Sequence, residues 1–339
     1  MSIAPAMTIS GWIILDKPVG MGSTQAVGAV KRALREAGEP KTKVGHGGTL
    51  DPLASGVLPI ALGEATKLAG RMLDATKAYD FTIRFGEETD TLDLEGQVIA
   101  TSDVRPRFAE VEAALPRFTG PIEQVPPAFS ALKVDGKRAY DLARAGEEVA
   151  LKSRAVTIHR LYAWYNGVPV RSEEHEPLLD DSNIGAFVRS LRERNSALSA
   201  GKYERLCEIT LSATVSKGTY IRSLARDIAH ALNSVGHVTM LRRTRAGPFT
   251  LKQAISLDNL AEIAKGRALT RTVLPLEAGL DDIPGLPVTP EQAKLLRHGQ
   301  PLFGIPATSG LHLATDGGTP VALVEVLDGD LRVVRGFNL

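Results

Sequence analysis

Residues 45–62 read GHGGTLDPLASGVLPIAL, and the rest of the fold prediction works outward from this stretch. Its three-glycine loop lets the backbone approach a bulky group closely. The loop ends in Asp51-Pro52, where the proline restricts Asp51 to extended geometry, and an apolar segment begins at Gly56. The pattern predicts a carboxylate held on a rigid turn at a groove. An ordinary Asp-Pro turn is the alternative that the spacing leaves open.

The segments around this loop show helix and strand patterns in irregular order. Apolar residues recur on one helical face over 23–37, which predicts a helix capped by Ser23 or Thr24 and stopped by Gly38. Strict alternation predicts a strand at 79–85. Further strands are predicted at 128–134, 156–165, 209–215 and 237–246, and helices at 107–118, 137–145 and 221–234. This order favours an α+β sheet over a regular βαβ repeat.

The length of 339 residues suggests about two domains. We predict one large domain over 1–274 that carries a polar, acid-rich insertion at about 166–203. The segment 275–286 is rich in proline and glycine, which is typical of a linker. One short helix and several short strands follow, so we expect a small C-terminal β-barrel over 287–339.

Composition excludes several classes of protein. With 43% apolar residues, 23% charged residues and a net charge of +1, the chain is not disordered, collagen-like or a disulfide scaffold. Its single cysteine, Cys207, forms no intrachain disulfide, which indicates a reducing compartment. No apolar run approaches the ~20 residues of a membrane span, and the N-terminus lacks a signal peptide. We therefore expect a cytoplasmic protein without a membrane partner.

Metal and cofactor motifs are also missing from the sequence. The seven histidines include no pair three to five residues apart, and neither dinucleotide-binding nor P-loop motifs occur. We expect no metal and no cofactor. Ser130-Ala131-Leu132-Lys133 matches the S-x-x-K pattern of acyl-transfer serine enzymes, but the accompanying S-D-N and K-T-G motifs are absent, so a hydrolase is the weaker alternative.

A second candidate site lies in a basic part of the chain. Arg222 follows Lys217-Gly218-Thr219-Tyr220-Ile221 and suits a bidentate pair with a carboxylate, although a solvated helix arginine fits the pattern too. From 217 to 252 the chain carries seven bases and one acid. Within this run, Arg242-Arg243-x-Arg245 on a predicted strand favours phosphate contact over a merely solvated face.

Taken together, these motifs resemble the bacterial tRNA pseudouridine synthase B (TruB) family, which acts on uridine 55 of the tRNA T arm. The resemblance runs from Gly11 to about Phe249, apart from 166–203. It is carried by Leu15-Asp16-Lys17-Pro18-x-Gly20-x-x-Ser23, Gly45-His46-x-Gly48-Thr49-Leu50-Asp51-Pro52-Leu53-Ala54-x-Gly56-Val57-Leu58-Pro59, Lys77-x-Tyr79, Thr89-Asp90-Thr91, Gln124-x-Pro126-x-x-x-Ser130-Ala131-Leu132-Lys133, Ser216-Lys217-Gly218-Thr219-Tyr220-Ile221-Arg222 and Leu241-Arg242-Arg243.

The resemblance implies a pseudouridine-synthase α+β fold with a mixed, largely antiparallel sheet, flanking helices and a C-terminal PUA-like RNA-binding barrel. It implies no metal and no organic cofactor. The expected roles are catalytic carboxylate for Asp51, ion-pair partner for Arg222, base stacking and candidate base for Tyr79, base-pocket lining for Tyr220 and Leu241, RNA contact for His46, and substrate binding at a position near the cleft for Lys17. Arg243 is the expected phosphate contact.

Three functions are weighed on this basis. The first is a stand-alone enzyme, expected to be a monomer without an obligatory protein partner, that flips uridine 55 out of the T loop and isomerises it. The second is a guide-RNA-dependent relative inside a ribonucleoprotein. The third is an RNA-binding chaperone that folds tRNA without required catalysis. The sequence leaves open whether Asp51 acts as nucleophile or base.

Overall fold

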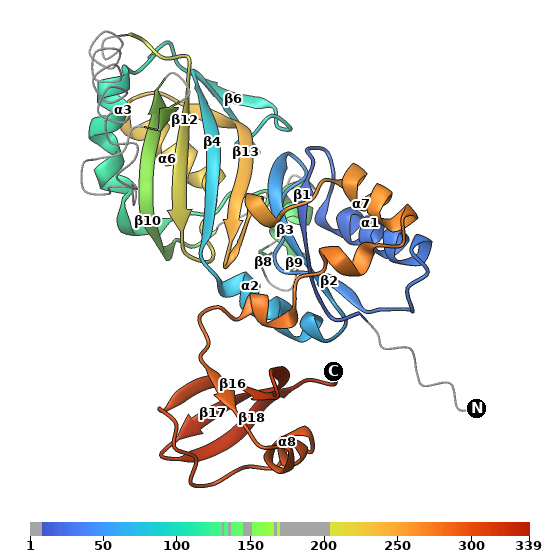
Figure 1. Cartoon of the computed structure of the whole chain (residues 1–339). Coiled ribbons are helices and arrows are strands. Elements are labelled where there is room, and N and C mark those ends of the chain that lie inside the picture. Colours follow the sequence, from blue (N-terminus) through green and yellow to red (C-terminus); the bar gives the residue numbers. More distant parts are fainter. Residues whose placement is uncertain (1–8, 131, 135–136, 145–150, 166–167, 170–203) are drawn as a thin grey trace, which may run out of the picture. The chain divides into compact units, whose positions relative to one another are not determined.

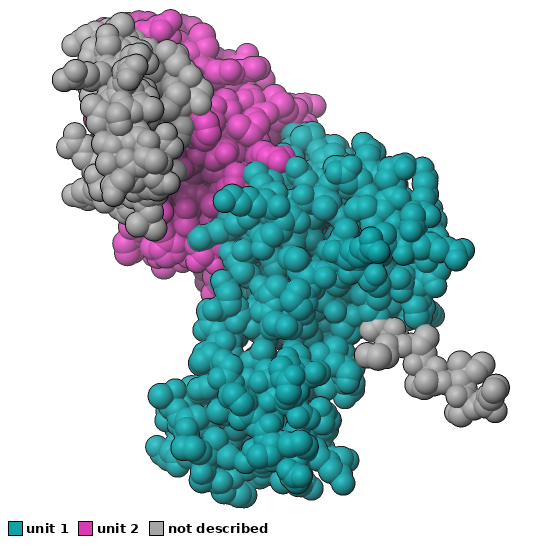
Figure 2. Space-filling model, viewed as in Figure 1, with its two compact units in different colours: residues 1–75, 245–339 teal, residues 76–244 magenta. Residues whose placement is uncertain are grey.

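The computed structural model describes residues 9–130, 132–134, 137–144, 151–165, 168–169 and 204–339. It divides into two compact units, coloured separately in Figure 2. Unit 1 comprises residues 1–75 and 245–339, and unit 2 comprises residues 76–244. This division differs from the predicted large domain over 1–274, whose boundaries stay a prediction. Apart from 168–169, the predicted insertion at 166–203 lies outside the described residues.

Unit 2 is built on a sheet with strand order β13-β4-β12-β10-β11, and β7 also pairs with β10 (Figure 1). The β4–β12, β12–β10, β10–β7 and β10–β11 pairs are antiparallel. Its elements are β4 (Lys77–Phe85), β5 (Glu87–Thr89), β6 (Val98–Thr101), α3 (Phe108–Ala114), η2 (Leu115–Phe118), β7 (Gly120–Gln124), β8 (Lys133–Val134), β9 (Lys137–Arg138), α4 (Ala139–Arg144), β10 (Arg154–Tyr165), β11 (Val168–Pro169), β12 (Glu208–Val215), α6 (Ile221–Ala231) and β13 (Gly236–Ala246).

Alternation along these strands gives the sheet one apolar face. Phe81 and Ile83 of β4 point to that face, where α6 packs against β4 and α3 packs against β10 (Figure 1). The buried side of α6, which includes Leu224 and Ile228, completes the core. Thr82, between Phe81 and Ile83, turns to the other face and lies 2.9 Å from Thr210 of β12 across the hydroxyl oxygens. This is the period-two pattern of a strand with one buried face.

Unit 1 has its own antiparallel strands, because β3 pairs with both β1 and β2. Trp12 of β1 anchors its core, with the indole centroid 5.2 Å from that of Phe249. The helices α1 and α7 pack against each other (Figure 1). The elements before residue 76 are β1 (Gly11–Lys17), α1 (Ser23–Glu36), β2 (Val44–His46), β3 (Ala54–Leu62), η1 (Gly63–Leu68) and α2 (Ala69–Asp74). Those from residue 249 to 279 are β14 (Phe249–Thr250), η4 (Leu251–Gln253), α7 (Leu257–Lys265), η5 (Leu269–Thr272) and η6 (Leu276–Gly279).

The predicted linker is not a free connection over its first half. The carbonyl of Leu276 accepts a hydrogen bond from Trp12 Nε1 at 3.0 Å, and Leu276 and Leu280 are buried. A Cβ on Gly279 would lie 2.8 Å from the Trp12 indole, so the chain passes directly over that ring. This part of 275–286 therefore belongs to the core of unit 1.

The C-terminal part is a sheet with strand order β15-β16-β17-β18 and one covering helix, α8. Its bounds are β15 (Gly285–Pro287), α8 (Pro290–Arg297), β16 (Gly310–Asp316), β17 (Thr319–Leu327) and β18 (Asp330–Gly336). The β15–β16 pair is parallel and the other two pairs are antiparallel. The described strands form an open sheet, with β15 and β18 at its edges, and not the closed barrel that the sequence suggested. Pro287 in β15 suits an edge position, because proline has no N–H to donate to a further strand.

The predicted fold class is confirmed in its main features: helices flank a large, mostly antiparallel sheet, and a small β-rich part follows. The helix at 23–37 and the strands at 79–85, 209–215 and 237–246 appear within a few residues of their predicted bounds. Among the described helices, none combines the length and apolarity that a bilayer crossing requires.

Candidate active site

Three predicted site residues, Lys17, His46 and Asp51, belong to unit 1, and the other five belong to unit 2. Asp51 is half-exposed in the loop between β2 and β3. His46 is the last residue of β2, where it pairs with Ile60 of β3. The glycine-rich loop therefore leaves the sheet at His46 and returns to it three residues after Asp51.

Ser23 fixes this loop from the start of α1. Its Oγ accepts a hydrogen bond from the backbone N–H of Leu50 at 2.8 Å and donates one to the carbonyl of Leu50 at 3.0 Å. The predicted cap role is wrong, because Ser23 is the first helical residue and Gln25 accepts the N–H of the N-cap Gly22 instead. A single buried hydroxyl thus satisfies both backbone groups of the residue before Asp51.

Lys17 supports the other side of Asp51. It is 0% exposed, and its Nζ donates to the carbonyls of Pro18, Met21 and Pro52 at 2.9, 2.6 and 3.3 Å. The substrate contact predicted for Lys17 therefore gives way to a structural role. The ammonium group sits among backbone oxygens because a buried cation needs compensating acceptors.

The loop has no room for a side chain at Gly47. A Cβ there would lie 2.7 Å from Cβ of Met72, and the Gly47 N–H donates to the carbonyl of Pro59 at 2.8 Å. A Cβ on Gly45 would meet nothing within 4 Å. The close approach that the sequence assigned to a bulky ligand is, at Gly47, an approach to the protein's own α2.

Arg222 is the second residue of α6 and is 8% exposed. Its Nη1 lies 3.2 Å from Asp93 Oδ2 and donates to the carbonyl of Thr91 at 2.8 Å. Its Nη2 donates to the carbonyl of Phe129 at 3.1 Å. These contacts hold the guanidinium in one orientation, whereas the alternative of a solvated helix arginine does not fit.

Asp93 is a site residue that the sequence did not single out. It is buried, and its Oδ1 accepts hydrogen bonds from Thr91 Oγ1 at 2.5 Å and from the Glu95 N–H at 3.1 Å. The preceding residue, Leu92, has a φ of 62°, a strained conformation that costs about 1–3 kcal/mol. The alternation of hydroxyls and acids in 89–93 is the only signal the sequence offered for this arrangement.

Tyr220 precedes α6 and is held by two neighbours. Its backbone N–H donates to Gln124 Oε1 at 2.8 Å, and the Arg154 guanidinium lies 5.0 Å from its ring centroid. Tyr79 of β4 and Leu241 of β13 are half-buried at the edge of the core of unit 2. The structure therefore seats these predicted pocket residues on the rigid sheet and helix of one unit.

Arg243 does not occupy the place that the charge run predicted. Its side chain is 1% exposed, so its guanidinium is not presented to solvent as a phosphate contact requires. Arg222 is buried as well, and Arg226 lies 2.8 Å from Asp227. Three of the seven bases of 217–252 are therefore buried or paired within unit 2, which weakens the predicted run of phosphate contacts. Within the described ranges, no three His, Cys, Asp or Glu side chains gather closely enough to hold a metal ion.

Two models of known protein families match this chain. A model described as the N-terminal domain of TruB family pseudouridylate synthase matches residues 32–166, and one described as the tRNA pseudouridylate synthase B C-terminal domain matches residues 222–281. The chain belongs to the TruB family of pseudouridylate synthases.

Relatives within the TruB family match over nearly the whole chain. The protein named tRNA pseudouridine synthase B from Novosphingobium aromaticivorans is 59% identical over 98% of each chain. The protein of the same name from Zymomonas mobilis is 54% identical over 100% of each chain. The one from Caulobacter vibrioides is 43% identical over 98% of this chain and 97% of its own.

Solved structures share the TruB fold at lower identity. A chain in an H/ACA RNP bound to a substrate RNA containing 2′-deoxyuridine has a TM-score of 0.65 at 22% identity, covering 97% of this chain and 85% of that one. A chain in an archaeal box H/ACA sRNP Nop10–Cbf5 complex has a TM-score of 0.63, also at 22% identity, covering 97% of this chain and 86% of that one. At this identity the likeness establishes the fold alone.

Proposed function

We propose that the protein isomerises uridine 55 in the T arm of tRNA to pseudouridine, with Asp51 as the catalytic carboxylate. The observation that carries the proposal is the set of hydrogen bonds that hold the Asp51 loop in place. Leu50 and Pro52 are fixed by Ser23 and Lys17, while Asp51 between them is half-exposed. The names of relatives up to 59% identical support tRNA as the substrate.

The chemistry needs a fixed carboxylate and no added reactant. The bond from uracil N1 to the ribose breaks, the ring turns while it stays bound, and C5 bonds to the same ribose carbon. The C5 proton leaves and N1 gains one, so substrate and product are isomers. Asp51 has two chemically consistent roles in this sequence, as nucleophile and as the base that deprotonates the sugar.

The residues of unit 2 are assigned to the flipped base. Unstacking a base costs a few kcal/mol, and stacking on Tyr79 offsets about 1–3 kcal/mol of it. Tyr79 is also the proposed base for the C5 proton, and Tyr220 and Leu241 line the pocket. Arg222 is assigned as the charged partner of the catalytic carboxylate. In unit 1, His46 is the proposed RNA contact beside the flipped nucleotide.

We further propose that the protein acts alone, as a cytoplasmic monomer on free tRNA. The full-length match to relatives named tRNA pseudouridine synthase B supports this assignment over a guide-RNA-dependent enzyme. The test is carbodiimide treatment and primer extension on a tRNA transcript after incubation with purified protein and no guide RNA. We expect a single stop at uridine 55 and none on a transcript with cytidine there. No product without guide RNA would contradict the proposal.

A further inference from the structure

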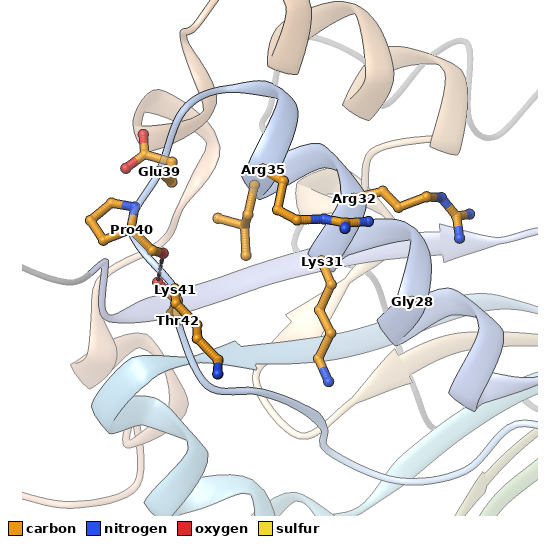
Figure 3. A pocket seen from close by; sticks show the side chains of 9 residues that line it. Gly28, Lys31, Arg32, Arg35, Glu39, Pro40, Lys41 and Thr42 are labelled. Atoms are coloured by element: carbon orange, nitrogen blue, oxygen red, sulfur yellow. Dashed lines mark hydrogen bonds between the residues drawn. The ribbon is translucent and has the colours of Figure 1, made fainter.

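The outer face of α1 carries a basic groove that the proposed chemistry does not use (Figure 3). Lys31, Arg32 and Arg35 follow Gly28 at intervals of three, four and seven residues, so all four share one helical face. Lys41 comes from the loop that joins α1 to β2 and lines the same groove. The groove, which we call the α1 groove, has a volume of about 720 Å³.

The cations of the α1 groove outnumber its acids and form no ion pair within the described residues. Its four cations, Lys31, Arg32, Arg35 and Lys41, are exposed, and in the described part of the chain none of them forms an ion pair with a carboxylate. Glu39 is the single acid of the lining. The one acid of α1, Glu36, lies near Lys265 of α7, whose pKa is raised mainly by its hydrogen bond and charge interaction with Glu262 and further by Glu36. A surface with this excess of positive charge favours an anionic partner.

The α1 groove is part of the same rigid piece as the Asp51 loop. Ser23, which holds Leu50, opens α1, and Lys31 follows eight residues later, about 12 Å along the helix at 1.5 Å per residue. On the other side, Lys41 is followed almost directly by β2, which ends at His46. A polyanion bound at the Asp51 loop therefore has the α1 groove within reach.

We propose that the α1 groove binds backbone phosphates of the substrate RNA outside the modified loop. The inference rests on the proposed function for the identity of the RNA. A duplex presents one phosphate charge per ~1.7 Å, so several fall within the groove at once. An anionic membrane suits this face less well, because amphipathic helices that bind membranes insert large apolar residues, and the exposed positions of α1 carry none.

Gly28 offers a test that does not threaten the fold. A Cβ there meets only Arg32 Nη1, at an ordinary 3.9 Å, and both Glu and Gln favour a helix more than Gly does. We expect Gly28→Glu to weaken binding of a full-length tRNA transcript about tenfold through charge repulsion. Gly28→Gln, the neutral side chain of equal size, stays close to wild type. Equal Kd values for the two variants would overturn the proposal.

The salt dependence of tRNA binding reports how many backbone phosphates the protein contacts. The double variant Lys31→Gln with Arg35→Gln should lower the slope of log K against log salt concentration by about 2, one for each lost contact. The matched control is Lys265→Gln on α7, which pairs with Glu262 outside the groove and leaves the slope unchanged. A double variant with the wild-type slope would refute the phosphate contact.

Two further experiments identify what the α1 groove binds. On a T-loop hairpin cut to a few base pairs, the double variant should bind like wild type, whereas an undiminished defect would place the contact inside the loop and contradict the proposal. If phosphatidylglycerol vesicles lose affinity for the double variant while tRNA does not, the groove is a membrane contact and the proposal is wrong. Pseudouridine formation by the wild-type protein is measured separately. If the wild-type protein forms pseudouridine and the variants bind RNA as tightly as it does, the phosphate contact at the α1 groove is refuted while the proposed function stands.

Discussion

Arg222 and Asp93 form a buried ion pair in unit 2, with Nη1 3.2 Å from Oδ2 although 129 residues separate them in the chain. Their side chains are only 9% and 10% exposed. The pair joins the start of α6 to the turn between β5 and β6. It ties the orientation of the proposed active-site arginine to the acidic segment 87–95.

The first prediction concerns the removal of that carboxylate. Asp93→Ala removes one partner of the buried Arg222–Asp93 ion pair, and breaking a buried pair costs about 3–5 kcal/mol. We expect the free energy of unfolding, measured with urea, to fall by this amount and pseudouridine formation to slow. Asp103→Ala is the control, because Asp103 is exposed. A loss below about 1 kcal/mol, the range of surface pairs, would mean that the pair is not a structural tie.

Ser23→Ala tests the support of the Asp51 loop. The change leaves the buried N–H and C=O of Leu50 without their hydroxyl, at about 1–3 kcal/mol for an unsatisfied buried group. We expect the single-turnover rate to fall more than RNA affinity does, because the loop loses position and not charge. Thr24→Ala removes an exposed hydroxyl next to it and should change neither quantity. An unaltered rate in Ser23→Ala would contradict this role.

The glycine loop supplies a matched pair of variants. Gly47→Ala places a methyl group 2.7 Å from Met72 Cβ, so the loop must shift and pseudouridine formation should drop at least tenfold. Gly45→Ala meets open space and should behave like wild type. The comparison is made by single-turnover kinetics with both proteins at equal RNA saturation. Equal rates for the two variants would show that the position of the loop against α2 is not important for pseudouridine formation.

Arg243→Met separates structural burial from RNA contact. Because Arg243 is almost fully buried, its replacement alters the packing of the interior, and we expect a loss of about 0.5–3 kcal/mol in the free energy of unfolding. The salt slope of tRNA binding, measured at a temperature where the variant is folded, should stay that of wild type. A slope lower by about 1 would restore the phosphate contact that the sequence predicted.

Local patterns in the sequence predicted the elements well. The alternation at Phe81 and Ile83 marks β4 because the strand has one buried face. The one-sided pattern of Val27 and Val30 marks α1 for the same reason. The order of the motifs then indicated the family, and the family indicated the candidate site residues. The motif around Asp51 could be recognised because its residues are continuous in sequence.

Contacts between distant segments could not be predicted in this way. Lys17 and Arg243 were expected to contact the RNA, yet both side chains are almost completely enclosed, which is rare for charged residues. The hydroxyl of Ser23 reaches Leu50, 27 residues away, and not the local cap position. The Trp12–Leu276 hydrogen bond spans 264 residues and draws the predicted linker into the core. Each depends on tertiary structure that no local pattern encodes.

The central claim is tested most directly by Asp51→Asn, assayed for pseudouridine at position 55 of a tRNA transcript with RNA affinity measured in parallel. The substitution keeps the size of the side chain and removes its charge and basicity. The account predicts a loss of about 10³-fold or more in rate, equivalent to ~4 kcal/mol, with tRNA affinity close to wild type. Pseudouridine formation at the wild-type rate in Asp51→Asn would contradict it.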